Sequence, residues 1–543
     1  MKQLLHIREI AKKVGLQEED IIYYGNNKCK LRDEILNKKD FENSKLILVT
    51  AITPTKAGEG KTMTAIALLD ALNKIDKKAI AVLREPSMGP TFGLKGGATG
   101  GGMASIEPKT EINLHFTGDM HALTSTINLI SAVIDNHIYQ GNELNIDPSR
   151  ILWKRALDCN DRELREVEIG LGAKTNGIKR TEHFTITVAS ELMAILCISK
   201  DEKDFLRRVS EILIGYTFDN KPVYLKDLDI EGAIYAIMKD ALLPNMVQTL
   251  ENNPCLVHGG PFANIAHGCA SLIGTTFARK LAPIVIEEAG FASDLGAEKF
   301  YDIKCREGNL NPACTVLVAT IRALKQHGGV EFENLNEENI DALKEGSKNL
   351  LKHYSNLQKF NVPVVVAINH FASDSNLEVE TLKSILEENK IKYAFLDGFL
   401  KGSEGSIDLA NKVLEVLDTK KFVLKNVYDL NDSIKDKITK LAKEIYNAKE
   451  VEFSDESLKS IKEIENLGKS NLYICMAKTQ SSISDDPKKL NVPENYTFHV
   501  RDVYLSNGAG FIVCLAGNIL TMPGLPKVPR AVGFKYEWSK ESK

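Results

Sequence analysis

The stretch that decides the fold runs from Lys45 to Asn73 and reads KLILVTAITPTKAGEGKTMTAIALLDALN. Its first nine residues, up to Thr53, form a nearly continuous apolar run, which predicts a strand buried on both faces of a parallel sheet. Between residues 61 and 73, apolar side chains recur at helical spacing instead. The glycine-containing loop TPTKAGEGK therefore connects a buried strand to a helix.

A glycine loop between a strand and a helix favours phosphate binding, because successive backbone N–H groups and the positive helix N-terminus face one point. We expect Lys61 to reach the β- and γ-phosphates of ATP and the Thr62 hydroxyl to bind Mg²⁺. The usual pattern has a glycine five residues before Gly60, where this chain has Thr55. The alternative is a simple strand-to-helix turn. The predicted ATP-binding residues are Thr55, Lys56, Ala57, Gly58, Glu59, Gly60, Lys61 and Thr62.

A second strand-like run, residues 78–83, is followed by two charged residues. Arg84 and Glu85 thus stand at the carboxyl end of a strand, where open α/β sheets bind their ligands. Downstream, the segment INLHFTGDMHAL adds three further polar candidates, His115, Asp119 and His121.

Residues 93–108 form a loop with six glycines among its first ten positions. A loop of this composition is either a flexible linker or a place where backbone approaches an anionic ligand closely. Because it interrupts an α/β pattern and carries a cation, we favour the second interpretation, with Lys95, Gly96 and Gly97 at the anion.

Composition limits the remaining possibilities. A chain of 543 residues predicts two to four domains, and 43% apolar with 26% charged residues predicts a globular protein. A net charge of −4 without a basic stripe argues against nucleic acid as a partner. The N-terminus predicts an amphipathic helix rather than a signal sequence, and no apolar run reaches the length of a membrane span. Nine scattered cysteines suit a reducing cytosol, so we expect a cytoplasmic protein.

Longer motifs follow along nearly the whole chain: WKRALDCNDRELR (153–165), TITVASELMAILCIS (185–199), HGGPFANIAHGCAS (258–271), EEAGFASDLGAEKFYDIKCR (287–306), VATIRALKQHGG (318–329), VPVVVAINHFASD (362–374), CMAKTQSSISDDP (475–487) and NILTMPGLPKVP (518–529). In content and order they resemble the motifs of the formate–tetrahydrofolate ligases, also called 10-formyltetrahydrofolate synthetases.

The resemblance implies a reaction in which formate, ATP and tetrahydrofolate give 10-formyltetrahydrofolate, ADP and phosphate through formyl phosphate. Arg84 would hold formate and then formyl phosphate, because a guanidinium binds an oxyanion through two hydrogen bonds. The implied catalytic residues are Lys61, Arg84, Glu85, His115 and Asp119. ATP with Mg²⁺, tetrahydrofolate as co-substrate, stimulation by a monovalent cation and a homotetramer are also implied, with neither nucleic acid nor membrane as a partner.

In the family the pterin ring lies between two aromatic side chains. Phe371, in INHFASD, resembles one of these positions, and Phe399, in FLKGSEG, stands where the family has a tryptophan. For any single phenylalanine, packing in the core is the competing interpretation.

Several positions depart from the family pattern in the loops expected around the ligands: Lys56, Met103, Ser105, Ala372, Phe399, Ser481 and Asn518. A divergent but active ligase is the favoured explanation. A paralogue that activates another small acid, or uses another acceptor, is the alternative. A third hypothesis is a P-loop regulatory ATPase, although such proteins are commonly about half this length.

The fold class predicted is α/β, with a P-loop NTPase-like, mostly parallel sheet in a large N-terminal domain and two smaller α/β domains. We place the large ATP-binding domain at residues 1–355 and a second α/β domain, contributing to the folate site, at 356–450. A small C-terminal α/β domain is expected at 451–543, closing over the nucleotide and the folate.

Overall fold

The computed structural model describes residues 3–37, 41, 44–56, 58–93, 98–418, 422–519 and 525–534. At its centre is a sheet of twelve strands within this part of the chain. They are β1 (Ile21–Tyr23), β2 (Cys29–Leu31), β3 (Lys45–Ala51), β4 (Ala79–Leu83), β5 (Gly100–Gly101), β6 (Ala104–Glu107), β14 (Asn245–Thr249), β15 (Pro254–Val257), β16 (Ile284–Glu288), β17 (Cys314–Ala319), β18 (Val364–Asn369) and β19 (Tyr393–Leu396).

The strand order is β1-β2-β14-β15-β4-β16-β3-β17-β18-β19, with β6 paired to β14 and β5 to β6. From β15 to β19 all neighbours are parallel, whereas the pairs from β1 to β15 are antiparallel. The predicted mostly parallel α/β sheet is confirmed, and β3 lies in its interior. Polar groups that follow β4, β16, β3, β17 and β18 therefore gather along one edge.

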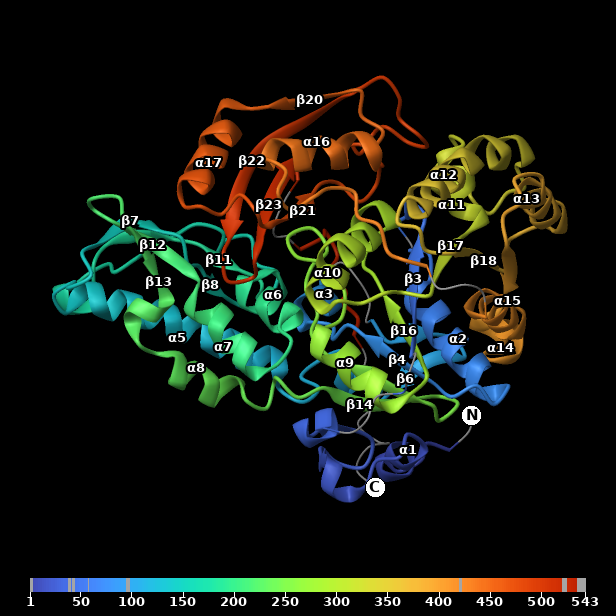
Figure 1. Cartoon of the computed structure of the whole chain (residues 1–543), viewed down its shortest axis with the longest axis horizontal. Coiled ribbons are helices and arrows are strands. Elements are labelled where there is room, and N and C mark those ends of the chain that lie inside the picture. Colours follow the sequence, from blue (N-terminus) through green and yellow to red (C-terminus); the bar gives the residue numbers. More distant parts are fainter. Residues whose placement is uncertain are drawn as a thin grey trace.

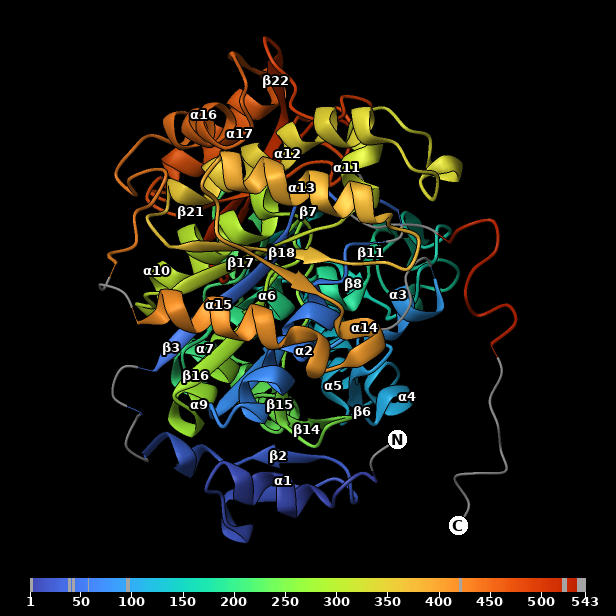
Figure 2. The ribbon, with the colours of Figure 1, turned by 90° about the vertical axis from the view of Figure 1, so that its right-hand side faces the viewer.

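Helices cover both faces of the sheet (Figures 1 and 2). The α-helices of the described residues, whether they cover this sheet or lie beside it, are α1 (Ile7–Lys13), α2 (Lys61–Lys74), α3 (Met88–Phe92), α4 (Lys109–Ile112), α5 (Asp119–Tyr139), α6 (Glu191–Ile198), α7 (Glu202–Ser210), α8 (Glu231–Met238), α9 (Leu272–Leu281), α10 (Arg306–Gly308), α11 (Ile321–His327), α12 (Ile340–Gln358), α13 (Asn376–Glu388), α14 (Gly398–Lys401), α15 (Ile407–Leu417), α16 (Ile434–Glu444) and α17 (Asp455–Asn466).

The apolar run of β3 divides between the two faces, because successive side chains of a strand point in opposite directions. Ile47 and Val49 join a core with the apolar residues of α2 and α15, which pack side by side (Figure 2). Leu46 and Leu48 belong to the second core, together with residues of α9 and α12. Burial on both faces explains why the β3 sequence shows no alternation of polar and apolar residues.

A lobe beside the large sheet contains three small sheets and lies at the left of Figure 1. Its strands are β7 (Ile146–Ile151), β8 (Arg155–Ala156), β9 (Val167–Ile169), β10 (Arg180–Glu182), β11 (Phe184–Thr185), β12 (Leu213–Thr217) and β13 (Pro222–Tyr224). A separate four-stranded sheet forms near the C-terminus, at the top of Figure 1, with α16 and α17. Its strands are β20 (Glu450–Phe453), β21 (Tyr473–Ala477), β22 (Thr497–Ser506) and β23 (Phe511–Ala516).

The domain division expected at residue 355 does not coincide with an end of the large sheet. Position 355 falls within α12, and β18 then pairs with β17 while β19 pairs with β18. The segment expected to form a second domain therefore supplies two strands to the first sheet. Within the described residues, a new sheet begins only with β20, near the expected C-terminal boundary.

Among the described residues, we find no helix with the length and apolar character that crossing a bilayer requires. The nine cysteines are free, and all except Cys159 are buried.

Candidate active site

The loop between β3 and α2 has the backbone conformation that its glycines allow. Gly58 and Gly60 have φ angles of +82° and +78°, in the left-handed region that other residues rarely adopt. A Cβ on Gly60 would lie 2.6 Å from the side-chain Nδ2 of Asn369. Gly60 is thus required both for the turn and for the close approach of β18.

Thr55, which replaces the usual first glycine, is accommodated because its φ is not positive. Its backbone N–H donates to Glu59 Oε1 at 2.7 Å, inside the loop itself. Lys56 is exposed, with its ammonium 6.0 Å from the centre of the Phe332 ring. Ala57, predicted to bind ATP, lies outside the described residues.

Thr62 and Lys61 begin α2 and face an acid from a neighbouring strand. The Thr62 hydroxyl donates to Glu288 Oε2 at 2.7 Å, and Glu288 is the last residue of β16, which pairs with β3. Burial lowers the pKa of Lys61, and the nearby Glu288 carboxylate opposes that shift. Glu288 was not among the predicted site residues, although it lies at the carboxyl end of the apolar run IVIEE and within the motif at residues 287–306.

Arg84 follows β4 and reaches the same acid. Its Nη2 lies 3.7 Å from Glu288 Oε1, and its side chain is 24% exposed. Its buried Nε has no hydrogen-bond partner among the described residues. A Cβ on Gly290 would lie 2.7 Å from Arg84 Nη1, so a larger residue at this position would displace the guanidinium. Unused donors on a half-buried guanidinium suit an oxyanion ligand.

Glu85 and Asp119 lie together in a buried polar group that also contains Lys30. Lys30 Nζ is 2.8 and 3.1 Å from the two carboxylate oxygens of Asp119, and Asn245 Nδ2 donates to Asp119 Oδ2 at 2.8 Å. Burial, and then the charge of Asp119, raise the pKa of Glu85 well above its usual value. The Asp119 carboxylate is paired with the Lys30 ammonium, whereas burial favours the neutral form of Glu85.

The histidine candidates lie elsewhere. The side chain of His115, in the turn between α4 and α5, is exposed, and so is that of His121 on α5. No hydrogen bond or ion pair joins either histidine to Glu85 or Asp119 within the described residues. Lys95, Gly96 and Gly97 lie outside the described residues, so the structure gives no position for this part of the glycine-rich loop.

Phe371 and Phe399 follow β18 and β19, two neighbouring parallel strands. The Phe371 ring is stacked by Arg322, whose guanidinium carbon lies 3.7 Å from the ring centre. Phe399 is 50% exposed and packs on the β5–β6 hairpin. Its carbonyl oxygen accepts the Met103 N–H at 2.9 Å, and a Cβ on Gly102 would come within 2.1 Å of that oxygen.

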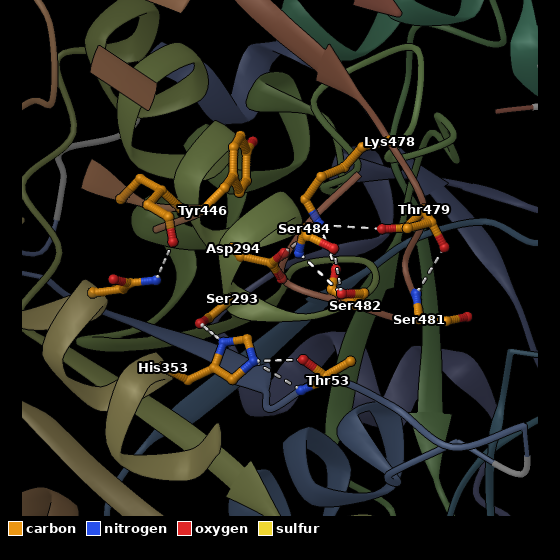
Figure 3. A network of polar contacts seen from close by, with 12 residues as sticks. Thr53, Ser293, Asp294, His353, Tyr446, Lys478, Thr479, Ser481, Ser482 and Ser484 are labelled. Atoms are coloured by element: carbon orange, nitrogen blue, oxygen red, sulfur yellow. Dashed lines mark hydrogen bonds and ion pairs between the residues drawn. The ribbon is translucent and has the colours of Figure 1, made fainter. Parts of the chain in front are cut away.

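A network of buried polar groups links the C-terminal sheet to Thr53, at the start of the loop between β3 and α2 (Figure 3). Lys478, after β21, pairs with Asp294 at 2.7 Å. The adjacent Ser293 contacts His353 Nδ1 at 2.7 Å, and His353 Nε2 accepts the Thr53 N–H at 3.0 Å. Burial lowers the pKa of His353 to about 4, so the ring is neutral and can accept that bond.

The loop, the helix that follows it and the charged groups at the ends of β4 and β16 lie at the carboxyl edge of an α/β sheet, which is where enzymes of this fold class hold their ligands. The family model described as formate–tetrahydrofolate ligase matches residues 1–541. The chain belongs to this family, and it is an ATP-dependent enzyme that ligates formate to tetrahydrofolate.

Proposed function

We propose that the chain activates formate as formyl phosphate at the loop Gly58–Thr62 and then transfers the formyl group to the nitrogen at the 10-position of tetrahydrofolate. One observation carries this proposal. Lys61 and Thr62 after β3, Arg84 after β4 and Glu288 at the end of β16 converge from three neighbouring parallel strands. This convergence suits a transferring phosphoryl group beside a small anion.

In the first step, a formate oxygen attacks the γ-phosphorus of ATP, the bond to the bridging oxygen breaks, and ADP leaves. In the second step, the folate nitrogen attacks the formyl carbon, the bond from carbon to the phosphate oxygen breaks, and the nitrogen loses its proton. Phosphate leaves with one oxygen that came from formate. Neither step needs a covalent bond to the protein, so positioning and charge supply the catalysis.

Lys61 would offset negative charge on the β- and γ-phosphates, and Arg84 would bind the formate oxygens. Magnesium fits beside them, because the Thr62 hydroxyl and the Glu288 carboxylate, 2.7 Å apart, are the oxygen ligands that Mg²⁺ prefers. When bound with ATP, Mg²⁺ neutralises phosphate charge.

For the folate, we propose that the pterin ring stacks on Phe371 and Phe399, which adjacent strands place at the same edge of the sheet. Glu85, Asp119 and Lys30 would support the strand end that carries Arg84 rather than contact the substrates, since all three side chains are buried and Lys30 is paired with Asp119. Stimulation by a monovalent cation and assembly as a homotetramer stay predictions from the family resemblance.

The test is an isotope experiment with formate labelled with ¹⁸O, ATP and tetrahydrofolate, each substrate omitted in turn. The proposal predicts inorganic phosphate that carries one labelled oxygen, formed only when formate and ATP are both present. Phosphate without label would exclude formyl phosphate. Turnover with another carboxylic acid, and none with formate, would support the alternative that the chain is a paralogue that activates another small acid. Met103 and the other altered loop residues are the reason for considering this alternative.

A further inference from the structure

Glu59, inside the ATP loop, holds three separate parts of the protein together. Its carboxylate accepts the Thr55 N–H at 2.7 Å through one oxygen and the Thr320 hydroxyl through the other. Its backbone carbonyl accepts the Asn369 side-chain N–H at 3.0 Å. Glu59, Thr320 and Asn369 are all at most 1% exposed. Buried bonds to a carboxylate fix geometry firmly, because breaking one leaves an unpaired group away from water.

Thr320 and Asn369, the two residues that Glu59 contacts across the fold, are each connected to Phe371. Thr320 caps the N-terminus of α11, where its hydroxyl accepts the Ala323 N–H at 3.2 Å. Two residues on, Arg322 stacks its guanidinium on the Phe371 ring. The second partner, Asn369, ends β18 and stands two residues before Phe371 in the chain. Glu59 is therefore connected to the Phe371 ring in two ways, through Thr320 and through Asn369.

The close packing at Gly60 makes these connections stiff. The Asn369 Nδ2 lies 2.6 Å from where a Cβ of Gly60 would be, so the turn that carries Lys61 cannot shift towards β18 without displacing the Asn369 side chain. The loop after β18 is braced as well, because the Phe371 N–H donates to Asp374 Oδ2 at 2.8 Å. A displacement of the ATP loop is thus transmitted to the ring rather than absorbed by loose side chains.

We propose that Glu59 is a positioning residue that couples the nucleotide site to the folate site, so that nucleotide binding changes the affinity for tetrahydrofolate through Thr320 and Asn369. This inference rests on the proposed placement of folate at Phe371. By thermodynamic reciprocity, folate binding must change the affinity for nucleotide by the same factor.

The experiment measures the Kd for tetrahydrofolate by calorimetry under nitrogen, with and without saturating Mg²⁺ and a non-hydrolysable ATP analogue. We call the larger of these two Kd values divided by the smaller the ratio. In the unaltered protein we expect this ratio to be about five or more. Thr320→Val removes the hydroxyl that Glu59 holds, and we expect the ratio to fall to within about twofold of one. Thr320→Ser keeps the hydroxyl and should retain the ratio. Asn369→Ala, which removes the second connection, should reduce the ratio as well.

A matched control is Thr381→Val on α13, whose hydroxyl donates to the carbonyl oxygen of Leu377 in its own helix; it should leave the ratio unchanged. Thermal unfolding checks that each variant is folded. If Thr320→Val is not folded, the ratio measured for Asn369→Ala decides whether the two sites are coupled. An unaltered protein with a ratio near one, or a Thr320→Val protein that keeps the original ratio, would overturn the coupling.

Phe371→Ala separates this proposal from the one it rests on. A Kd for tetrahydrofolate that does not change in Phe371→Ala would show that the folate lies elsewhere, and both proposals would fall. A Kd that rises about tenfold or more in Phe371→Ala, together with an unchanged ratio in Thr320→Val, would leave the folate site standing and reject only the coupling.

Discussion

At the scale of single residues, Glu288 completes a site that the loop sequence describes only in part. Lys61, Thr62 and Arg84 could be predicted because each follows a strand-like run within a few positions in the sequence. Glu288 is 226 residues from Thr62, and only the parallel pairing of β16 with β3 brings it to the Thr62 hydroxyl. Such non-local pairing has no signal in local composition.

Glu288→Gln tests this role. The amide keeps the shape of the side chain but loses the charge that would help to hold Mg²⁺ beside Thr62. We expect kcat to fall by about 10²-fold and the Mg²⁺ concentration for half-maximal activity to rise about tenfold. Steady-state kinetics at varied Mg²⁺ measure both, with the exposed Glu388→Gln on α13 as the control. An unchanged Mg²⁺ dependence would remove Glu288 from the metal site.

At the scale of elements, the proposed folate site is built from a hairpin and a short helix that are distant in sequence. The β5–β6 hairpin packs on α14 through the contact between Gly102 and Phe399, whereas the motifs predicted only the two phenylalanines. The sequence also predicted a second domain at residues 356–450, and β18 and β19 of this segment pair within the large sheet. Their apolar runs would suit either sheet, because strand sequences do not specify their partners.

Gly102→Ala tests the packing of this hairpin. The glycine has a φ of +59°, and an added Cβ would lie 2.1 Å from the Phe399 carbonyl oxygen, so α14 must move. We expect the KM for tetrahydrofolate to rise about tenfold, with the KM for ATP within about twofold of its original value. Gly468→Ala is a matched control, because its φ of +70° is similar but nothing lies within 4 Å of the added Cβ. Equal effects of both substitutions on the folate KM would contradict the account.

At the scale of the whole molecule, several polar contacts attach the C-terminal sheet to the rest of the protein. One is the network from Lys478 to Thr53 in Figure 3. Another is Glu191, at the start of α6, which accepts the Gly508 N–H at 2.7 Å from the turn between β22 and β23. A C-terminal unit was predicted, but these contacts were not, since Glu191 and Gly508 are 317 residues apart.

Glu191→Gln tests the second attachment through pH. Burial raises the pKa of Glu191 from 4.5 to about 7, so the folded protein retains a proton that the unfolded chain has released. The contribution of this group to stability is therefore full below pH 4.5 and falls as the pH rises to 7, by on the order of 3 kcal/mol in total. Thermal unfolding from pH 5 to 8 should show this decline in the unaltered protein and a flatter profile in Glu191→Gln. Identical profiles would mean that Glu191 does not titrate in this range.

The claim on which the account depends is that ATP binds at Gly58–Thr62, beside Arg84. The most direct measurement is a crystal structure with Mg²⁺ and a non-hydrolysable ATP analogue. We predict the γ-phosphate about 2.7–3.2 Å from Lys61 Nζ and the metal on the Thr62 hydroxyl. A nucleotide bound in another part of the molecule, with the loop and Arg84 untouched, would contradict the account.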